Sequence, residues 1–136
     1  MEFIKYNANP KNWNTGDCVI RAISAATQKT WEETYDALDK IGRRKCRLPN
    51  DTPVYKEYLK NYYFIEEKQM KHSNGTKYMI DELIDEYPDD ILLIHCTHHL
   101  TCAIQGNLVD TWNCRYKVAG KFWRLPKEYF DESDIE

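Results

Sequence analysis

Cys18 is the residue of this sequence best placed for nucleophilic chemistry. It follows a Gly16-Asp17 turn and opens an apolar stretch, residues 18–27, that has the spacing of a helix. At the start of a helix, unpaired backbone N–H groups and aligned peptide dipoles favour a thiolate over a thiol and lower the pKa of a cysteine. The sequence therefore predicts that Cys18 is a nucleophile.

A thiolate nucleophile needs an imidazole beside it, which holds it as an ion pair and later protonates the leaving group. Of the four histidines, His98 and His99 stand at the start of an apolar strand, from which a side chain can project. Because side chains alternate along a strand, these two point to opposite faces, and the residues alone leave the choice between them open.

Asp110 and Asn113 are the candidates for the third group, which orients the imidazole. A three-residue loop at 105–107 sets His99 directly opposite Asn113, with side chains ~5 Å apart. A two-residue loop at 106–107 instead leaves Asp110 four positions from His99, ~13 Å along the strand. We therefore prefer Asn113, while a bulge would bring Asp110 within reach.

The rest of the chain must supply the elements that position these groups. Apolar spacing and capping signals predict further helices at about 30–42, 52–62 and 77–87. After Pro88 the pattern changes to short apolar runs typical of strands, at 91–96, 99–105, 108–113 and 122–125, and a short strand is also predicted at 63–67. These patterns predict one α+β domain over residues 1–136, with helices packed on a C-terminal antiparallel sheet and a frayed acidic tail at 131–136.

Composition and charge narrow the class of protein. A formal net charge of −3, with acids and bases interspersed, gives no broad basic face for nucleic acid. The basic run 43–47 reads as a solvated helix end or as a small anion or substrate contact. No signal peptide or membrane-length apolar run is present, so we expect a cytoplasmic protein without membrane contact. Five cysteines, an odd number, indicate free thiols rather than a disulfide framework.

The order of these residues resembles that of small bacterial and phage papain-like cysteine peptidases, similar to staphopains and to the peptidases that trim double-glycine leaders. The resembling segments are Gly16-Asp17-Cys18, the strand start at 99–104 and the pair Trp112-Asn113. The resemblance selects His99 over His98. The stretch GDCVIRAIS is also similar to a group of phage and bacterial proteins with a later His-Leu and Asp-Thr-Trp, in which Asp110 is the repeated acid.

In papain-like enzymes an amide six residues before the nucleophile donates a hydrogen bond to the oxyanion. That position is Asn12 here, with Asn14 as a substitute and the backbone N–H of Cys18 as a second donor. The resemblance implies a papain-like fold and a peptidase- or amidase-type hydrolase that acts on a protein or peptide through a thioester, without metal or cofactor. Acyl transferases and deamidases use the same groups, and the sequence does not choose among them.

Two further functions compete with this interpretation. A papain-like domain without activity could bind a protein or peptide, because fold and activity are separable. A zinc site is the other alternative, since Cys96, His98, His99 and Cys102 lie within seven residues, with Cys114 nearby. On an extended backbone, however, Cys96 and Cys102 are ~20 Å apart, which is too far for one ion.

Overall fold

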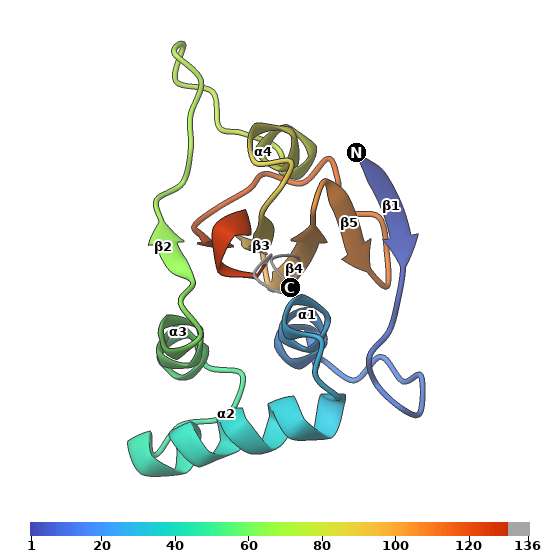
Figure 1. Cartoon of the computed structure of the whole chain (residues 1–136), viewed down its shortest axis with the longest axis vertical. Helices are drawn as coiled ribbons and strands as arrows, with labels where there is room; N and C mark the ends of the chain where they lie inside the picture. The colour runs from blue at the N-terminus through green and yellow to red at the C-terminus, as the bar shows by residue number, and fades with distance from the viewer. Residues whose placement is uncertain (131–136) are drawn as a thin grey trace.

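The structure is a computed structural model that describes residues 1–130, and the acidic tail predicted at 131–136 lies outside the described residues. The fold is α+β (Figure 1). The helices are α1 (Cys18–Thr27), α2 (Trp31–Lys45), α3 (Thr52–Asn61) and α4 (Ile80–Glu86). The strands are β1 (Glu2–Lys5), β2 (Ile65–Glu67), β3 (Ile91–Cys96), β4 (His99–Ile104), β5 (Asn107–Asp110) and β6 (Phe122–Leu125).

The strands form one sheet in the order β1-β5-β4-β3-β6-β2. Its pairs are antiparallel except for β1, which runs parallel to β5. The prediction of an antiparallel sheet was therefore wrong at this edge. The sequence pattern did not reveal β1, because the strand has only four residues and only Phe3 and Ile4 among them are apolar. Its place is decided by pairing with a strand about a hundred residues away.

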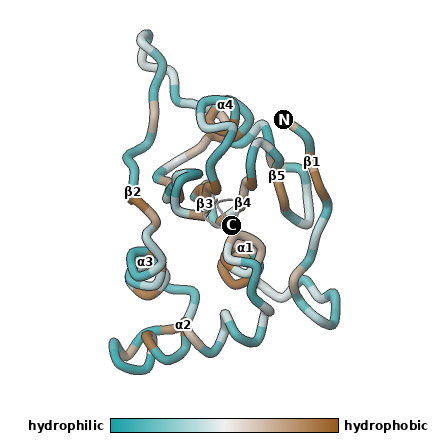
Figure 2. The backbone as a smooth tube through the Cα atoms, in the orientation of Figure 1, coloured by the Kyte–Doolittle hydropathy of each residue, from teal (hydrophilic) through white to brown (hydrophobic). Residues whose placement is uncertain are grey.

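The sheet separates two hydrophobic cores. One core lies under α1, α2 and α3, and the other lies under α4 on the opposite face (Figure 1). Along β3, Leu93 packs into the first core, while Leu92 and Ile94 pack into the second. A strand that is covered on both faces reads as a continuous apolar run, and this explains the sequence of β3. Figure 2 shows hydrophobic residues along the strands of the sheet and on α1.

Helix α1 is the central helix and packs against β4. It begins at Cys18, as predicted, and its residues 19–26 are all buried. Helix α2 begins with the predicted capping box, in which Thr30 accepts from the Glu33 N–H and the Glu33 side chain accepts from the Thr30 N–H. Because α1 lies on β4, its first residue meets the start of that strand, where His99 stands.

The basic segment 43–47 ends α2 on the surface. Its cations pair with acids of the same chain: Arg43 with Asp39, Arg44 and Lys45 with Glu57, and Arg47 with Asp51. The segment thus has the ion-paired, solvated character that one of the two sequence interpretations describes. Among the helices formed by residues 1–130, none combines the length and the apolar character needed to cross a membrane.

Candidate active site

The turn between β4 and β5 sets the strand register, and this register decides whether Asp110 or Asn113 lies beside His99. Ile104 pairs with Asn107, so Gln105-Gly106 is a two-residue turn. Both turn residues have positive φ, 47° and 87°, as a type I′ hairpin requires. Both loops considered from the sequence were therefore wrong. The reversal begins one residue earlier than the Gly-Asn pair suggested, because Gln105 adopts a left-handed conformation that residues other than glycine rarely take.

This register brings Asp110, and not Asn113, to the histidine. It sets Asp110 beside Thr101, two residues along β4 from His99 and on the same face, and the Asp110 carboxylate reaches both side chains. Asn113 lies beyond the end of β5, is exposed, and accepts hydrogen bonds from the backbone N–H and Nε of Arg115. The preference for Asn113 rested on a three-residue loop that does not form.

Asp110 is a buried carboxylate, 8% exposed, that is fully hydrogen-bonded. Its Oδ2 lies 2.7 Å from Nε2 of His99 and accepts from the Thr101 hydroxyl at 2.6 Å, while Oδ1 accepts from the Thr111 N–H at 2.6 Å. Burial raises the pKa of Asp110, but the hydrogen bonds from His99, Thr101 and Thr111 outweigh it and lower the pKa. Because an ionised carboxylate can only accept, Nε2 of His99 carries the proton that joins them.

The side of the His99 ring opposite Asp110 is available to Cys18. With Nε2 donating to Asp110, Nδ1 is the ring nitrogen left to interact with Cys18, and His99 lowers the pKa of that thiol. Burial lowers the pKa of His99, but the hydrogen bonds with Asp110, Cys114 and Cys18 raise it well above the ordinary value. The carboxylate therefore favours an imidazolium beside the sulfur.

The Cys18 thiol is half-buried at the first residue of α1. Burial raises its pKa, but three effects outweigh burial and lower it: the hydrogen bond with His99, a hydrogen bond from the Leu100 N–H, and the positive charges of His99 and Arg21. The two pKa shifts, downward for Cys18 and upward for His99, both favour a thiolate beside an imidazolium. This arrangement can attack a carbonyl carbon and protonate a leaving group.

His98 does not join this group. It occupies the turn between β3 and β4, has a positive φ of 56° and is exposed. The two cysteines of the zinc alternative lie on opposite faces of the sheet. Cys96 packs into the core under α4, and Cys102 packs into the core under α1. Burial raises the pKa of both thiols, to about 11 for Cys96.

The structure does bring together a different set of three ligand-type atoms, from His99, Asp110 and Cys114, within 4.8 Å of one another. The His99 and Asp110 atoms are 2.7 Å apart, which is a hydrogen-bond distance. Two atoms that share a tetrahedral zinc ion, each about 2.0 Å from the metal, lie roughly 3.3 Å apart. The geometry therefore matches a hydrogen-bonded pair better than a pair of metal ligands.

Trp112 covers the imidazole from the solvent side. Its ring centroid lies 5.2 Å from that of His99, and the residue is 41% exposed. It also lines a polar cavity of about 500 Å³, whose other lining residues are Lys5, Tyr6, Asn7, Asn12, Asn14 and Thr111. Both amides expected from the sequence to bind the oxyanion, Asn12 and Asn14, therefore line a cavity together with Trp112, the residue that contacts the His99 ring.

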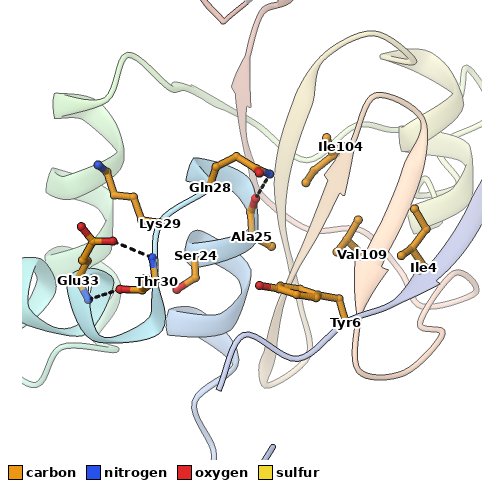
Figure 3. Close-up of a pocket in the computed structure, with 10 residues that line it drawn as sticks. All are labelled: Ile4, Tyr6, Ser24, Ala25, Gln28, Lys29, Thr30, Glu33, Ile104 and Val109. Carbon is orange, nitrogen blue, oxygen red and sulfur yellow. Dashed lines mark hydrogen bonds between the residues drawn. The ribbon is translucent and has the colours of Figure 1, made fainter. Parts of the chain in front are cut away.

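A second cavity, of about 460 Å³, lies along the C-terminal half of α1 and is drawn in Figure 3. Tyr6 lines both cavities, and in Figure 3 its ring points from the end of β1 toward Ser24 of α1. Cys18, His99 and Asp110 line neither of these two cavities. The polar cavity is the one that adjoins them, because Trp112 contacts the His99 ring and Thr111 donates to Asp110.

Sequence reasoning missed three contributors to the site: Thr101, Cys114 and Arg21. Thr101 could have been found, because it shares a strand face with His99. Arg21 stands one helical turn after Cys18, so its proximity to the thiol was also readable. Cys114 approaches Asp110 Oδ2 at 3.9 Å from a loop, and no local pattern indicates this.

A comparison of the sequence with protein-family models found no match, and neither did comparisons with curated proteins and with solved structures.

Proposed function

We propose that the chain is a cysteine-dependent hydrolase of the papain-like type, in which Cys18 attacks an amide or ester carbonyl. His99 is the acid and base, and Asp110 orients the imidazole. The single observation that carries this proposal is the place of His99, which donates from Nε2 to a buried carboxylate at 2.7 Å and lowers the pKa of the Cys18 thiol. A histidine that served only packing would not need a buried charge on one side and a thiol on the other.

The reaction divides into two acyl transfers. The Cys18 sulfur forms a bond to the carbonyl carbon, and the π electron pair moves onto the oxygen. When that pair returns, the bond to the leaving group breaks, and imidazolium His99 protonates the departing nitrogen or oxygen. Neutral His99 then takes a proton from water as water adds to the thioester, and the carbon–sulfur bond breaks. Acid product, thiolate and imidazolium are the result.

Oxyanion stabilisation in both steps would come from the backbone N–H of Cys18 and an amide of the neighbouring cavity. Asn12 and Asn14 both line that cavity. A peptide or protein is the substrate class that the resemblance implies.

Alkylation by iodoacetamide, followed for each cysteine by peptide mass spectrometry as a function of pH, tests the thiolate–imidazolium pair. Cys46 is the internal control, because it is the exposed cysteine of the chain. We expect Cys18 to alkylate with a midpoint below that of Cys46, and His99→Ala to move the midpoint of Cys18 upward. Comparing midpoints rather than rates removes the effect of partial burial on access.

An equal midpoint for Cys18 and Cys46, or a midpoint that is indifferent to His99→Ala, would contradict the proposal. The domain would then be better described as a binding module with a papain-like arrangement. Two results together would support a hydrolase. The alkylation midpoint of Cys18 would lie below that of Cys46 and depend on His99, and hydrolysis of p-nitrophenyl acetate would be lost in Cys18→Ala.

A further inference from the structure

A buried ion pair flanks the nucleophile in the sequence: Asp17 directly precedes Cys18, and Arg21 follows it by one helical turn. Asp17 and Arg21 are 4% and 7% exposed, and Nη1 of Arg21 lies 2.5 Å from Oδ1 of Asp17. Oδ2 of the same carboxylate accepts from Asn9 Nδ2 at 3.0 Å and from Trp31 Nε1 at 2.9 Å. A buried charge is costly unless it is paired and hydrogen-bonded, so these contacts fix the loop before Cys18 onto α1 and α2.

Arg21 also bonds Asn14, which lines the cavity beside Trp112. The Nη1 group that pairs with Asp17 donates to Oδ1 of Asn14 at 3.2 Å. Holding the oxygen of a planar amide fixes the direction of its two N–H donors, which lie on the other side of the group. Within residues 1–130, these N–H donors have no protein acceptor, and Asn14 itself lines the cavity. The donors are therefore available to a ligand there.

Asn12 lines the same cavity without such support. Its backbone has a positive φ of 56° and its N–H donates to the carbonyl oxygen of Asn9. In the described part of the chain, its side-chain amide takes part in no hydrogen bond with protein. Donors that stabilise an oxyanion act by being oriented before charge develops, and an amide that turns freely loses most of that effect.

We propose that Arg21 is a positioning residue, which holds the Asn14 amide so that its N–H donates to the oxyanion formed at Cys18. This inference rests on the proposed function. It selects Asn14 over Asn12, although Asn12 stands at the position that resemblance to papain-like enzymes favours. It also gives a reason for an arginine one helical turn beyond the nucleophile: the guanidinium serves the thiolate by charge and the oxyanion donor by orientation.

Two reactions of Cys18 separate orientation of the oxyanion donor from activation of the thiol. Acetylation by p-nitrophenyl acetate passes through a tetrahedral oxyanion, which collapses to S-acetyl-Cys18 and 4-nitrophenolate. Alkylation by iodoacetamide displaces iodide at a saturated carbon and forms no oxyanion. Both rates are measured in the whole chain with Cys46→Ser, so that the exposed competing thiol is absent. The ratio of the two rates reports the oxyanion donor alone.

We expect Asn14→Ala to lower the acetylation rate by about 100-fold and to change the alkylation rate by less than about twofold. Asn14 is exposed, so this variant leaves the core intact. The same substitution at Asn12 is the rival variant, and its effect on the ratio should be at least tenfold smaller. A larger effect of Asn12→Ala, or a ratio unchanged in Asn14→Ala, would overturn the inference.

Arg21→Lys tests the positioning role, because lysine keeps a positive charge for Asp17 and for the thiolate but loses the rigid guanidinium fork. If Arg21 acts through Asn14, Arg21→Lys lowers the rate ratio in the parent chain and lowers it no further in Asn14→Ala. A merely structural role would instead lower both reactions in both backgrounds, together with the melting temperature, and would refute the positioning role.

Failure of the inference is distinguishable from failure of the proposed function. If the parent chain acetylates Cys18 but the ratio of acetylation rate to alkylation rate is unchanged in Asn14→Ala, only the inference fails. If the parent chain releases no burst of 4-nitrophenolate and Cys18 alkylates with the same midpoint as Cys46 in the unsubstituted chain, the proposed function fails, and the inference fails with it.

Discussion

Replacing Asp110 by asparagine is the sharpest perturbation of the candidate site, because it removes one charge with little change in shape. In the structure, Oδ2 receives both the His99 N–H and the Thr101 hydroxyl, while Oδ1 receives the Thr111 N–H. An amide cannot satisfy all three donors, since its NH₂ group must face at least one of them. The substitution therefore makes the imidazolium form of His99 less favourable and leaves a buried N–H donor facing another donor.

The size of the effect follows from the hydrogen bond that loses its charge. A hydrogen bond to an ionised group contributes about 1.5 to 3 kcal/mol net. Since one pKa unit corresponds to about 1.4 kcal/mol, the loss lowers the pKa of His99 by about 1 to 2 units. His99 lowers the pKa of Cys18 by its hydrogen bond and its charge, so the alkylation midpoint of Cys18 rises in Asp110→Asn to the extent that either is lost, and at most by a similar amount. Below both midpoints, the rate then falls by up to about 10- to 100-fold.

The assay is the rate of Cys18 alkylation between pH 5 and 10, for the parent chain, Asp110→Asn and Asn113→Ala. Asn113→Ala is the matched control, because this amide lies beyond β5 and bonds Arg115 instead of His99. Above both midpoints all three proteins should alkylate at the same rate, which verifies that access to the thiol is unchanged. Circular dichroism and urea unfolding establish that Asp110→Asn is folded, at a cost of about 1 to 3 kcal/mol.

A midpoint that does not move in Asp110→Asn would refute the reasoning, because His99 would then be protonated without help from the carboxylate. A larger shift in Asn113→Ala than in Asp110→Asn would contradict the hairpin register itself.

Three further predictions concern single side chains. Thr101→Val preserves shape but removes a buried hydroxyl that donates to Asp110, so urea unfolding should show a loss of about 1 to 3 kcal/mol; an unchanged free energy of unfolding would mean that this hydroxyl does not stabilise the carboxylate. Cys18→Ala should abolish acetylation by p-nitrophenyl acetate and change the free energy of unfolding by less than about 1 kcal/mol, whereas a loss of several kcal/mol would identify Cys18 as a packing residue. Leu83→Ala, at a fully buried position of α4, should cost about 2 to 5 kcal/mol and leave the Cys18 midpoint unchanged, because this core lies on the other face of the sheet; a shifted midpoint would show that the two faces are coupled.

The helices and most strands could be predicted, because their signals are local. The start of α1 at Cys18, the capping box of α2 and the run of β3 depend on residues within one or two turns of each other. The order of cysteine, histidine and acid along the chain was also visible. By contrast, β1 escaped notice, because four residues carry too little periodicity to be recognised without their partner strand.

The choice between Asp110 and Asn113 shows where sequence reasoning stops. Both residues have suitable chemistry, and a shift of one residue in the hairpin decides which one faces His99. That shift depends on Gln105 accepting a left-handed conformation, which residue type alone disfavours and which the tertiary structure imposes.

The sequence by itself determined the nucleophile's place at a helix start, the histidine's place at a strand start and the α+β class, because each depends on neighbouring residues along the chain. The tertiary structure decided that α1 lies on β4, that Asp110 is the carboxylate beside His99, and that Arg21 joins Asp17 to Asn14. These contacts join segments that are distant in sequence or depend on a turn conformation, so only the packing of the whole sheet against its helices fixes them.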